Sequence, residues 1–297
     1  LPVPIISVGN ISLGGTGKTP LVIRIAEEAK RHNFNVGIIS RGYRRTGKNL
    51  VIVHNGKSIC SDVEKSGDEP YLMAKFFKGI PIISDSNRIR GSYELINRFK
   101  VNLIILDDGF QHRKIFRNID IVTINANENY KMYNMFPVGN LRESLFGLNR
   151  ADYIFVNKGT MENLPKKKKL QIFKNGKTFF SFSKFELRLN NRIIKESPKS
   201  PMIAFCAIAD PDYFFNSVIN NGITLCKKLS FNDHDPYKKN TINVIEKTVK
   251  LYSVSCLITT EKDYYKLPKY FTKKYLVYVQ VFRIGGNDKI FKQIINS

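Results

Sequence analysis

The hydrophobic positions from residue 1 to about 160 form short continuous runs that alternate with amphipathic stretches. Continuous apolar runs of this length are typical of strands buried on both faces of a parallel sheet. The predicted strands are Ile5–Val8, Val36–Ser40, Ile80–Ile83, Val101–Leu106, Ile119–Ile124 and Tyr153–Val156, and the predicted helices are Pro20–Arg31, Asp68–Phe77 and Arg88–Phe99. The pattern therefore predicts an α/β domain with a parallel sheet.

The pattern changes between Lys166 and about Pro201 and then returns. Lys166–Lys169 is a run of charge, which is typical of a solvated surface, and Phe179–Leu189 alternates as an antiparallel strand does. A second α/β rhythm follows, with strands at Met202–Ala207, Cys256–Thr260 and Tyr275–Val281 and a helix near Tyr213–Asn220. We therefore predict two three-layer α/β/α lobes: residues 1–176, a hairpin-like linker at 177–200, and a smaller lobe at 201–297.

The composition narrows the class of protein. Of the 297 residues, 42% are hydrophobic and 12% aromatic, which is enough for a sizeable core. The four cysteines are far apart and form no C-x-x-C pair, which excludes a disulfide scaffold and a zinc ribbon and fits a reducing cytoplasm. No apolar run approaches the roughly 18–20 residues of a membrane-spanning helix.

The charge is strongly positive, with 48 basic and 25 acidic residues giving +23. The excess is spread through both halves of the chain. It favours a polyanionic partner: nucleic acid, an anionic membrane surface or a phosphorylated substrate. An AT-rich genome, which inflates lysine and asparagine, is an alternative source of the excess, so charge alone does not choose.

The Gly-rich turn after the first predicted strand carries the strongest local signal. It reads Ser12-Leu13-Gly14-Gly15-Thr16-Gly17-Lys18-Thr19 and lies between a strand and a helix, as a phosphate-binding P-loop requires. Its glycines let backbone N–H groups face phosphates, and the start of the helix adds a favourable field. Lys18 would reach the β- and γ-phosphates of a nucleotide, and the Thr19 hydroxyl would ligate Mg²⁺.

Two features bear on this interpretation. Ser12 stands where the pattern G-x-x-x-x-G-K-T has its first glycine. The G-x-G-x-x-G spacing of a dinucleotide site is missing, so a Rossmann domain fits less well. We expect residues 12–19 to bind a nucleotide rather than form a plain turn, and the first lobe to be a P-loop NTPase-like parallel sheet.

Asp107 and Asp108 follow the apolar strand Val101–Leu106. Adjacent carboxylates at the carboxyl end of a strand next to a P-loop suit Mg²⁺, directly or through its waters. Capping of the following turn is the alternative. The sequence does not decide which of the two lies closer to the metal.

Three further polar clusters lie in turns. Gly67-Asp68-Glu69-Pro70 precedes a predicted helix, where Asp68 is either an N-cap or a base that accepts a hydroxyl proton, and the sequence alone favours the cap. Asp108-Gly109-Phe110-Gln111-His112 lies beside the metal strand, and His234 lies in the acidic turn of the second half. We expect the other histidines, His32 and His54, at the surface.

Taken in order along the chain, these residues resemble the tetraacyldisaccharide 4′-kinases, the lipid A 4′-kinases of Gram-negative bacteria. The matching segments are Pro2-Val3-Pro4, Val8-Gly9-Asn10, Gly14 to Pro20, Ser40-Arg41-Gly42-Tyr43, Gly67 to Pro70, Asp107 to His112, Pro137 to Glu143, Asp233-His234 and Thr260-Glu261-Lys262-Asp263. Beyond the P-loop no single segment is decisive, but their joint order and spacing are specific, and Ser12 is what this family shows.

The resemblance implies a reaction, its cofactors and its location. ATP and Mg²⁺ would serve the transfer of the γ-phosphoryl to the 4′-hydroxyl of an acylated glucosamine disaccharide 1-phosphate, which gives lipid IVA. It also implies an active site between two α/β lobes at the cytoplasmic face of the inner membrane, with an anionic membrane surface as partner and neither nucleic acid nor an obligate protein partner.

The resemblance also assigns roles to residues. Lys18, Thr19, Asp107 and Asp108 would handle phosphates and metal, Asp68 would be the base, and His234 would act near it from the second lobe. The candidates for binding substrate or shaping the cleft are Arg41, Gln111, His112, Asn140, Arg142 and Glu143.

Two departures from the family accompany these expectations. The family usually begins with an apolar, membrane-associating segment before the Pro-x-Pro run, and this chain starts at Leu1. Attachment to the membrane would then be peripheral or through a segment absent from these residues. Asp235 stands where many members have a second histidine, so His234 is the expected functional residue.

Two other classes of function remain to be weighed against the kinase. One is a P-loop ATPase that acts on a protein or nucleic-acid partner; the charge fits it, but no nucleic-acid-binding module is recognisable. The other is a degenerate binding protein without activity, against which the presence of Lys18, Asp68, Asp107, Asp108 and His234 argues.

Overall fold

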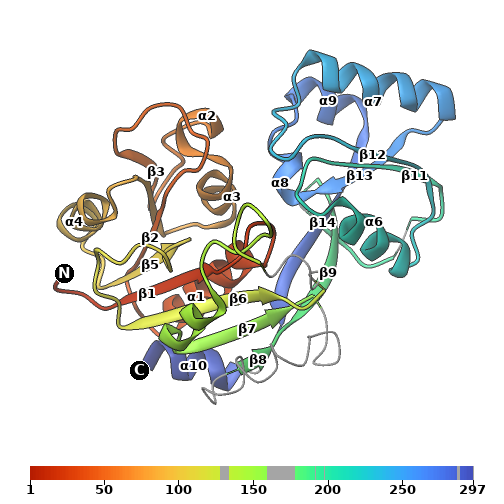
Figure 1. Ribbon diagram of the computed structural model, residues 1–297. Helices are drawn as coiled ribbons and strands as arrows, with labels where there is room; N and C mark the ends of the chain where they lie inside the picture. The colour runs from red at the N-terminus through yellow and green to blue at the C-terminus, as the bar shows by residue number, and fades with distance from the viewer. Residues whose placement is uncertain (128–133, 159–177, 191, 197, 286–287, 297) are drawn as a thin grey trace. The chain divides into compact units, whose positions relative to one another are not determined.

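The computed structural model describes residues 1–127, 134–158, 178–190, 192–196, 198–285 and 288–296. Within this part the chain forms two compact units, Leu1–Ser183 with Ile284–Ser297, and Lys184–Arg283. Each unit has its own sheet, with hydrophobic clusters and helices on both faces (Figure 1). The predicted fold class, two three-layer α/β/α lobes, is confirmed.

The sheet of the first unit has eight strands in the order β3-β4-β2-β5-β1-β6-β7-β8. The strands are β1 (Ile5–Asn10), β2 (Val36–Ser40), β3 (Val51–Asn55), β4 (Pro81–Ser84), β5 (Leu103–Asp107), β6 (Ile119–Asn125), β7 (Tyr153–Asn157) and β8 (Thr178–Phe180). All neighbours pair in parallel except β3 with β4. The central β1 lies between β5 and β6, so the loops after these three strands meet at one edge.

Successive residues of these strands point to opposite faces, and helices cover both. The helices are α1 (Lys18–Arg31), α2 (Val63–Ser66), α3 (Asp68–Phe76), α4 (Arg88–Phe99) and α10 (Asp288–Asn296), and a 3₁₀-helix, η2, spans Leu145–Arg150. Ile105 packs with residues of α1, α3 and α10, whereas its neighbours Ile104 and Leu106 pack with α4. This two-sided burial explains why the strands lack polar alternation.

The C-terminal helix α10 belongs to the first unit. The guanidinium of Arg24 in α1 lies 2.5 Å from a carboxylate oxygen of Asp288 and 4.6 Å from the ring centroid of Phe291. Phe291 also stacks on Phe155 of β7, with ring centroids 5.7 Å apart. The predicted second lobe, 201–297, therefore differs from the observed unit at its end, because an amphipathic pattern does not specify which sheet a helix covers.

The sheet of the second unit has six strands in the order β10-β9-β14-β13-β11-β12. Its elements are β9 (Phe182–Leu189), β10 (Arg192–Ile194), β11 (Met202–Cys206), α6 (Pro211–Asn220), β12 (Leu225–Ser230), α7 (Lys239–Tyr252), β13 (Cys256–Thr260), α8 (Glu261–Tyr264), α9 (Lys269–Lys274) and β14 (Leu276–Gly285). Phe205 packs with residues of α7 and α9, and the next residue, Cys206, packs with those of α6. The two sets of helices therefore cover opposite faces.

The segment predicted as a hairpin-like linker, residues 177–200, contributes to both sheets. β8 extends the first sheet by pairing in parallel with β7. β9 and β10 pair in antiparallel as a hairpin at the edge of the second sheet. The predicted run Lys166–Lys169 lies outside the described residues.

The surface position expected for His54 is wrong. His54 lies in β3, which the pattern did not reveal, and is 3% exposed. Burial lowers the pKa of this histidine, and its Nδ1 accepts a hydrogen bond of 3.0 Å from the Gly56 N–H. The side chain thus serves the local turn as a neutral imidazole.

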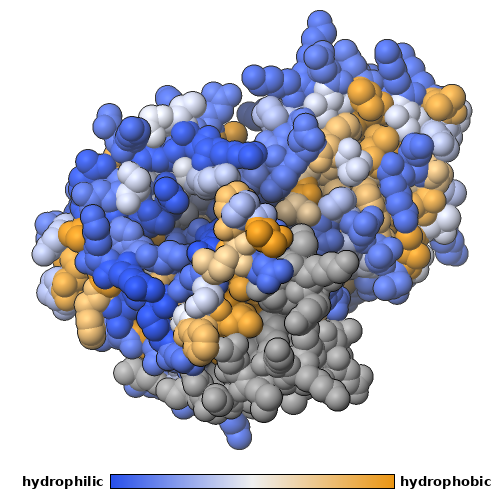
Figure 2. All heavy atoms as spheres, in the orientation of Figure 1, coloured by the Kyte–Doolittle hydropathy of each residue, from blue (hydrophilic) through white to orange (hydrophobic). Residues whose placement is uncertain are grey.

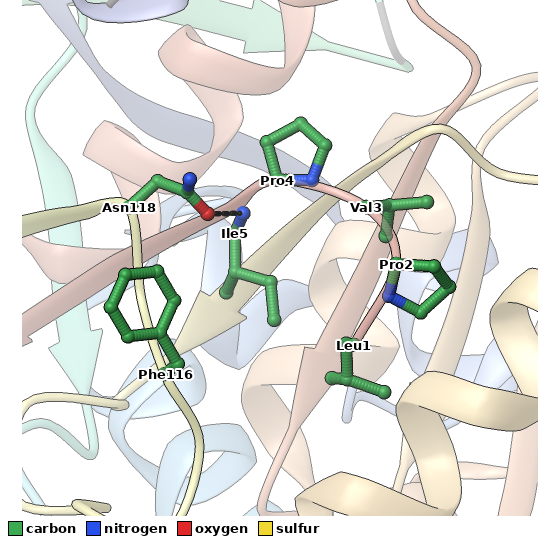
Figure 3. A pocket seen from close by; sticks show the side chains of 7 residues that line it. All are labelled: Leu1, Pro2, Val3, Pro4, Ile5, Phe116 and Asn118. Carbon is green, nitrogen blue, oxygen red and sulfur yellow. Dashed lines mark hydrogen bonds between the residues drawn. The ribbon is translucent and has the colours of Figure 1, made fainter.

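A hollow of about 310 Å³ lies at the start of β1, lined by Leu1 to Ile5, Phe116 and Asn118 (Figure 3). Two of its lining residues are joined by a hydrogen bond of 2.9 Å, which the Ile5 N–H donates to the Asn118 Oδ1. The P-loop follows the other end of β1, roughly 20 Å away for a strand of this length. This hollow is therefore separate from the predicted phosphate site.

No helix in the described part of the chain is both long and apolar enough to cross a bilayer.

Candidate functional site

The P-loop leaves β1 in a conformation that only glycine adopts easily. Gly14 and Gly17 have φ angles of +100° and +89°. A Cβ on Gly17 would also lie 2.6 Å from the Nδ2 of Asn157, whereas no atom lies within 4 Å of the Cβ position of Gly14. Gly17 caps α1 without a side-chain hydrogen bond to the helix. The loop thus presents open backbone and a helix start, as phosphate binding requires.

Three buried side chains hold this loop in place. The hydroxyls of Thr16 and Thr123 are 2.7 Å apart, and Thr123 also donates to the Gly9 carbonyl at 3.2 Å. Asn157, at the end of β7 and 3% exposed, donates from its Nδ2 to the Thr16 carbonyl at 2.6 Å. Sequence reasoning missed Thr123, a polar residue within the apolar strand β6, and Asn157, a polar residue at the end of β7.

We expect Asn157→Ala to weaken ATP binding by about 5- to 150-fold, since loss of a buried hydrogen-bond partner costs roughly 1–3 kcal/mol. The Thr16 carbonyl would lose its partner, and the loop would no longer be held in its open form. Isothermal titration with ATP measures the effect. Asn125→Ala is the matched control, because Asn125 ends the adjacent strand and binds the Asn127 N–H at 3.0 Å. Unchanged affinity in Asn157→Ala would show that the loop is rigid without this bond.

Residues 140–142 bind the start of the P-loop through their backbone. The Leu13 N–H donates to the Asn140 carbonyl at 2.7 Å, and the Arg142 N–H donates to the Ile11 carbonyl at 2.7 Å. Ser12 and Leu141 form a β-bridge between these two hydrogen bonds. The P-loop and the predicted substrate residues Asn140 and Arg142 therefore form one wall.

The carboxylates at the end of β5 lie beside the P-loop. Asp107 pairs in register with Val8 of β1, and Ser40 at the end of β2 donates its hydroxyl to Asp107 at 2.8 Å. Asp108 takes a positive φ of 53°. Its carboxylate lies 3.5 Å from the Lys18 Nζ and accepts hydrogen bonds of 3.0 Å from Arg142 at both oxygens. Three distant segments thus meet at Asp108.

The two carboxyl groups differ in ionisation. Burial, together with the charge of Asp108, raises the pKa of Asp107 to about 6. Burial alone would also raise the pKa of Asp108, but the ammonium of Lys18 and the guanidinium of Arg142 outweigh it and lower that pKa. Asp108 is therefore ionised throughout the neutral range, whereas Asp107 gains its charge only as the pH rises through about 6.

Without added Mg²⁺, we expect Asp107→Asn to become more stable relative to the parent as the pH rises. Unfolded Asp107 ionises near pH 4 and the folded group near 6, so the parent loses up to ~3 kcal/mol of unfolding free energy across that window. Asparagine does not titrate and removes this loss. Thermal unfolding of both proteins between pH 4 and 8 measures the difference. A constant stability difference across the range would refute the raised pKa.

The donors at this edge fit a hard divalent cation. Within the described residues, no three or more His, Cys, Asp or Glu side chains lie together so that they could hold a metal ion by themselves. Mg²⁺ is, however, usually held by one or two carboxylates together with substrate phosphates and waters. Asp107 and Asp108, with the Thr19 hydroxyl in the first turn of α1, supply oxygen ligands of that kind.

Arg88, which sequence reasoning missed, is buried at the start of α4 and is only 3% exposed. Burial lowers the pKa of this guanidinium, while the charges of Asp107 and Asp108 favour its ionised form. Its Nη1 donates to the Asp85 carbonyl at 3.1 Å. The signal that would have found it is a basic residue just after a predicted strand whose end meets the same sheet edge as Asp107.

His112 lies near several positively charged side chains. Burial lowers its pKa, and the charges of Arg88, Arg117, Lys114 and the exposed Arg41 lower it further. The imidazole is therefore neutral at pH 7. A neutral ring donates from one nitrogen and accepts at the other, which suits a polar ligand such as a sugar.

Gln111 and Glu143 bind each other. The Gln111 Nε2 donates to the Glu143 Oε1 and to the Asn10 carbonyl, both at 2.8 Å. The other carboxylate oxygen of Glu143 accepts from Arg150 at 2.8 Å. These contacts join the end of β1 to the segment after Asn140, so both side chains shape the wall beside the P-loop.

Asp68 opens α3 but does not cap it. The N-cap position belongs to Gly67, whose φ is +90°, and no side chain caps this helix. The alternative interpretation of Asp68 as an N-cap is therefore wrong. The charge of the next residue, Glu69, contributes to the raised pKa of Asp107, which shows that the first turn of α3 lies near the carboxylates.

His234 lies in the second unit, in the turn between β12 and α7. Its backbone has a φ of +67° and its N–H donates to the Ala207 carbonyl at 3.2 Å. Its Nε2 is 3.4 Å from the Lys262 Nζ and 3.7 Å from an oxygen of Asp233. Asp235 accepts the Tyr237 N–H at 2.7 Å and so stabilises the turn. The pairing of His234 with Asp68, a residue of the other unit, stays a prediction.

The turn that carries His234 rests on Asp263, a fully buried carboxylate of α8. One oxygen of Asp263 accepts the Ala207 N–H at 3.0 Å and the Thr260 hydroxyl at 2.7 Å. Because the Ala207 carbonyl in turn holds the His234 N–H, the Thr260–Asp263 motif acts on His234 through Ala207. The sequence shows the motif as one of the segments that resemble the family, but the connection to His234 depends on contacts that only the fold provides.

Comparison with known proteins places this geometry in a family. The family described as tetraacyldisaccharide-1-P 4′-kinase (LpxK) matches residues 1–297. Among curated proteins named tetraacyldisaccharide 4′-kinase, that of Desulfotalea psychrophila is 33% identical over 287 residues, 92% of this chain and 80% of the relative. That of Halothermothrix orenii is 34% identical over 293 residues, 92% of this chain and 76% of the relative.

A solved structure supports the same relationship. LpxK from Aquifex aeolicus, determined in complex with ATP, has a TM-score of 0.76 and 31% sequence identity, covering 100% of this chain and 89% of that chain. The match thus includes the P-loop, both carboxylates and the unit that carries His234. The chain belongs to the tetraacyldisaccharide-1-P 4′-kinase family.

Proposed function

We propose that this protein is an ATP-dependent kinase of a tetraacyldisaccharide 1-phosphate. It transfers the γ-phosphoryl of ATP to the 4′-hydroxyl of the lipid and gives lipid IVA. Family membership over the whole chain supports this choice of acceptor. The competing P-loop ATPase with a protein or nucleic-acid partner has no such support.

One observation carries the choice of phosphoryl transfer. Lys18 from the P-loop lies 3.5 Å from Asp108 at the end of the adjacent strand, and Asp107 lies next to it. Phosphoryl transfer needs positioning and charge neutralisation more than covalent chemistry. The meeting of a lysine, a helix start and two carboxylates supplies both.

The residues of the first unit divide this work. Backbone N–H groups of the P-loop and the start of α1 bind the phosphates of ATP, and Lys18 stabilises charge that develops on the transferred group. Thr19, Asp107 and Asp108 would hold Mg²⁺, which when bound neutralises the phosphate oxygens. Lys18 and Arg142 hold Asp108 ionised and so keep one ligand charged.

We assign proton transfer from the acceptor to Asp68. Its place in the first turn of α3, whose Glu69 contributes to the raised pKa of Asp107, supports this assignment. His234 of the second unit would orient or tune Asp68. Arg41, His112, Asn140 and Arg142 would contact the substrate, while Gln111 and Glu143 keep their wall in shape.

The experiment is a direct assay with purified protein, ATP, Mg²⁺ and a tetraacyldisaccharide 1-phosphate dispersed in neutral detergent. Mass spectrometry should show a gain of one phosphoryl group on the lipid, placed at the 4′ position by fragmentation. ATP hydrolysis that rises with nucleic acid, and no phosphorylated lipid, would instead favour the ATPase. A protein that binds ATP but yields neither product would be a binding protein only.

A further inference from the structure

α7 and α9 of the second unit form one helical layer. Residues of both helices, among them Ile245 and Phe271, pack in one hydrophobic cluster on the same face of the sheet. Glu246 of α7 joins them further, because it lies 2.7 Å from the Lys274 Nζ of α9 and 3.3 Å from the hydroxyl of Tyr275. We call this the α7/α9 layer.

The α7/α9 layer concentrates positive charge. Its exposed lysines are Lys238, Lys239, Lys247, Lys250, Lys269, Lys273 and Lys274. Between residues 238 and 252 and between 268 and 276, Glu246 is the one acidic residue. The hydrogen bond from Lys274 lowers the pKa of Glu246, which shows that its charge is already matched within the layer.

The segment that covers the opposite face of the same sheet lacks this positive charge. Residues 207–224, which contain α6, include Asp210 and Asp212 and no lysine or arginine. Lys228 of β12 reaches this face, where its Nζ lies 5.8 Å from the ring centroid of Phe215. A general excess of lysine in the sequence would load both faces alike. The segregation is therefore a property of the fold rather than of the composition.

Apolar side chains stand among the lysines of the layer. Val244 and Leu251 are spaced by two helical turns, lie on the outward stripe of α7 opposite its buried residues, and are 46% and 80% exposed. Tyr252, Tyr270 and Leu276 are exposed as well. Over α7 and α9, Figure 2 shows a mainly hydrophilic surface broken by separate hydrophobic residues.

We infer that the α7/α9 layer docks on an anionic lipid surface. This inference rests on the proposed function, because a kinase of a lipid must work at the bilayer that holds it. Lysines near an anionic bilayer are attracted to it, each adding about fivefold to partitioning. Aliphatic and tyrosine side chains between the lysines enter the headgroup region. Aliphatic tips favour lipid over nucleic acid, which stacks on aromatic rings and has no place for Leu251 or Val244.

Vesicle co-sedimentation of the full chain tests the inference. The protein should bind vesicles of phosphatidylcholine with phosphatidylglycerol and bind vesicles of phosphatidylcholine alone far less. Glutamine at Lys247, Lys250, Lys269 and Lys273 together should reduce binding to the anionic vesicles by at least about tenfold. We omit Lys274 because it pairs with Glu246.

The matched control replaces Lys57, Lys78, Lys100 and Lys292, which are exposed lysines of the first unit, by glutamine. It removes the same charge and should change binding about threefold or less. Leu251→Ser with Val244→Ser should weaken binding and make the remainder more sensitive to salt, because only the electrostatic part is left. Phosphorylation of substrate in neutral detergent should be unchanged in every variant.

Three results would overturn the inference. One is that the quadruple variant of the layer binds anionic vesicles as tightly as the parent does. Another is that the control variant loses as much vesicle binding as the layer variant. Alternatively, the layer variant loses binding to duplex DNA while vesicle binding is unaffected, which would make nucleic acid the partner. A parent protein that phosphorylates no lipid would defeat the proposed function instead, and vesicle binding would still decide the role of the layer.

Discussion

Lys18→Ala is expected to lower kcat for lipid phosphorylation by roughly 10²–10³ or more, since loss of one preorganised charge stabiliser in a transition state costs that much. Lys18 begins α1, directly after the glycine that caps it, and its Nζ lies 3.5 Å from Asp108. Alanine leaves no positive charge for the phosphates and also releases Asp108 from one of its two cations. Steady-state assays and ATP titration measure the two consequences separately.

Lys30→Ala is the control for this variant. Lys30 lies on the same helix, and its Nζ donates to the Lys78 carbonyl at 2.7 Å, away from the P-loop. It should keep full activity and the same helix content. If Lys18→Ala retains activity within about tenfold of the parent, the P-loop does not act as proposed.

Asp68→Asn is expected to lower kcat by about 10²–10⁴, the contribution typical of a general base. Because Gly67 occupies the N-cap of α3, asparagine at position 68 removes charge and basicity without removing a cap. ATP affinity and thermal stability should stay close to those of the parent. Measurement of kcat, of the ATP dissociation constant and of the melting temperature separates catalysis from folding.

A true N-cap supplies the control. Asp62 accepts the Lys65 N–H at 2.9 Å and caps α2. Asn caps about as well as Asp, so Asp62→Asn should leave both rate and stability unchanged. Equal and small effects of the two substitutions would mean that Asp68 is not a base.

His234→Ala tests the proposed pairing with Asp68. It should lose less activity than Asp68→Asn, and the double variant should lose less than the product of the two, because groups that act as a unit are non-additive. Strictly multiplicative losses would show that the two residues act independently.

The sequence predicted those parts of the site whose signal is local. The P-loop is one continuous segment, and Asp107 and Asp108 follow a strand whose apolar run marks its end. By contrast, the side chains that hold the P-loop are distant, since Thr16 binds Thr123 and Asn157, which lie more than 100 residues along the chain. Periodicity reports burial of a segment and carries no information about its partner.

The same limit explains the errors in the fold. The pattern indicates neither β3, an edge strand that is only partly buried, nor the sheet that α10 covers. Taken alone, it favours a cap at Asp68, which is wrong because the position of the cap depends on the backbone angle at Gly67. The burial of Arg88 was equally hidden, since arginine is rarely buried without a charged partner that only the fold provides.

The return of the chain to the first unit has a consequence for biosynthesis. The polypeptide leaves that unit at Ser183 and re-enters it at Ile284, so the second unit is in effect an insertion. Phe291, Ile294 and Ile295 of α10 complete the cluster that also contains Leu21 and Ile25 of α1. A nascent chain folds from its N-terminus as it emerges from the ribosome. The first unit therefore stays incomplete until α10 has also been made, and the apolar residues that α10 covers need protection while the inserted unit is synthesised.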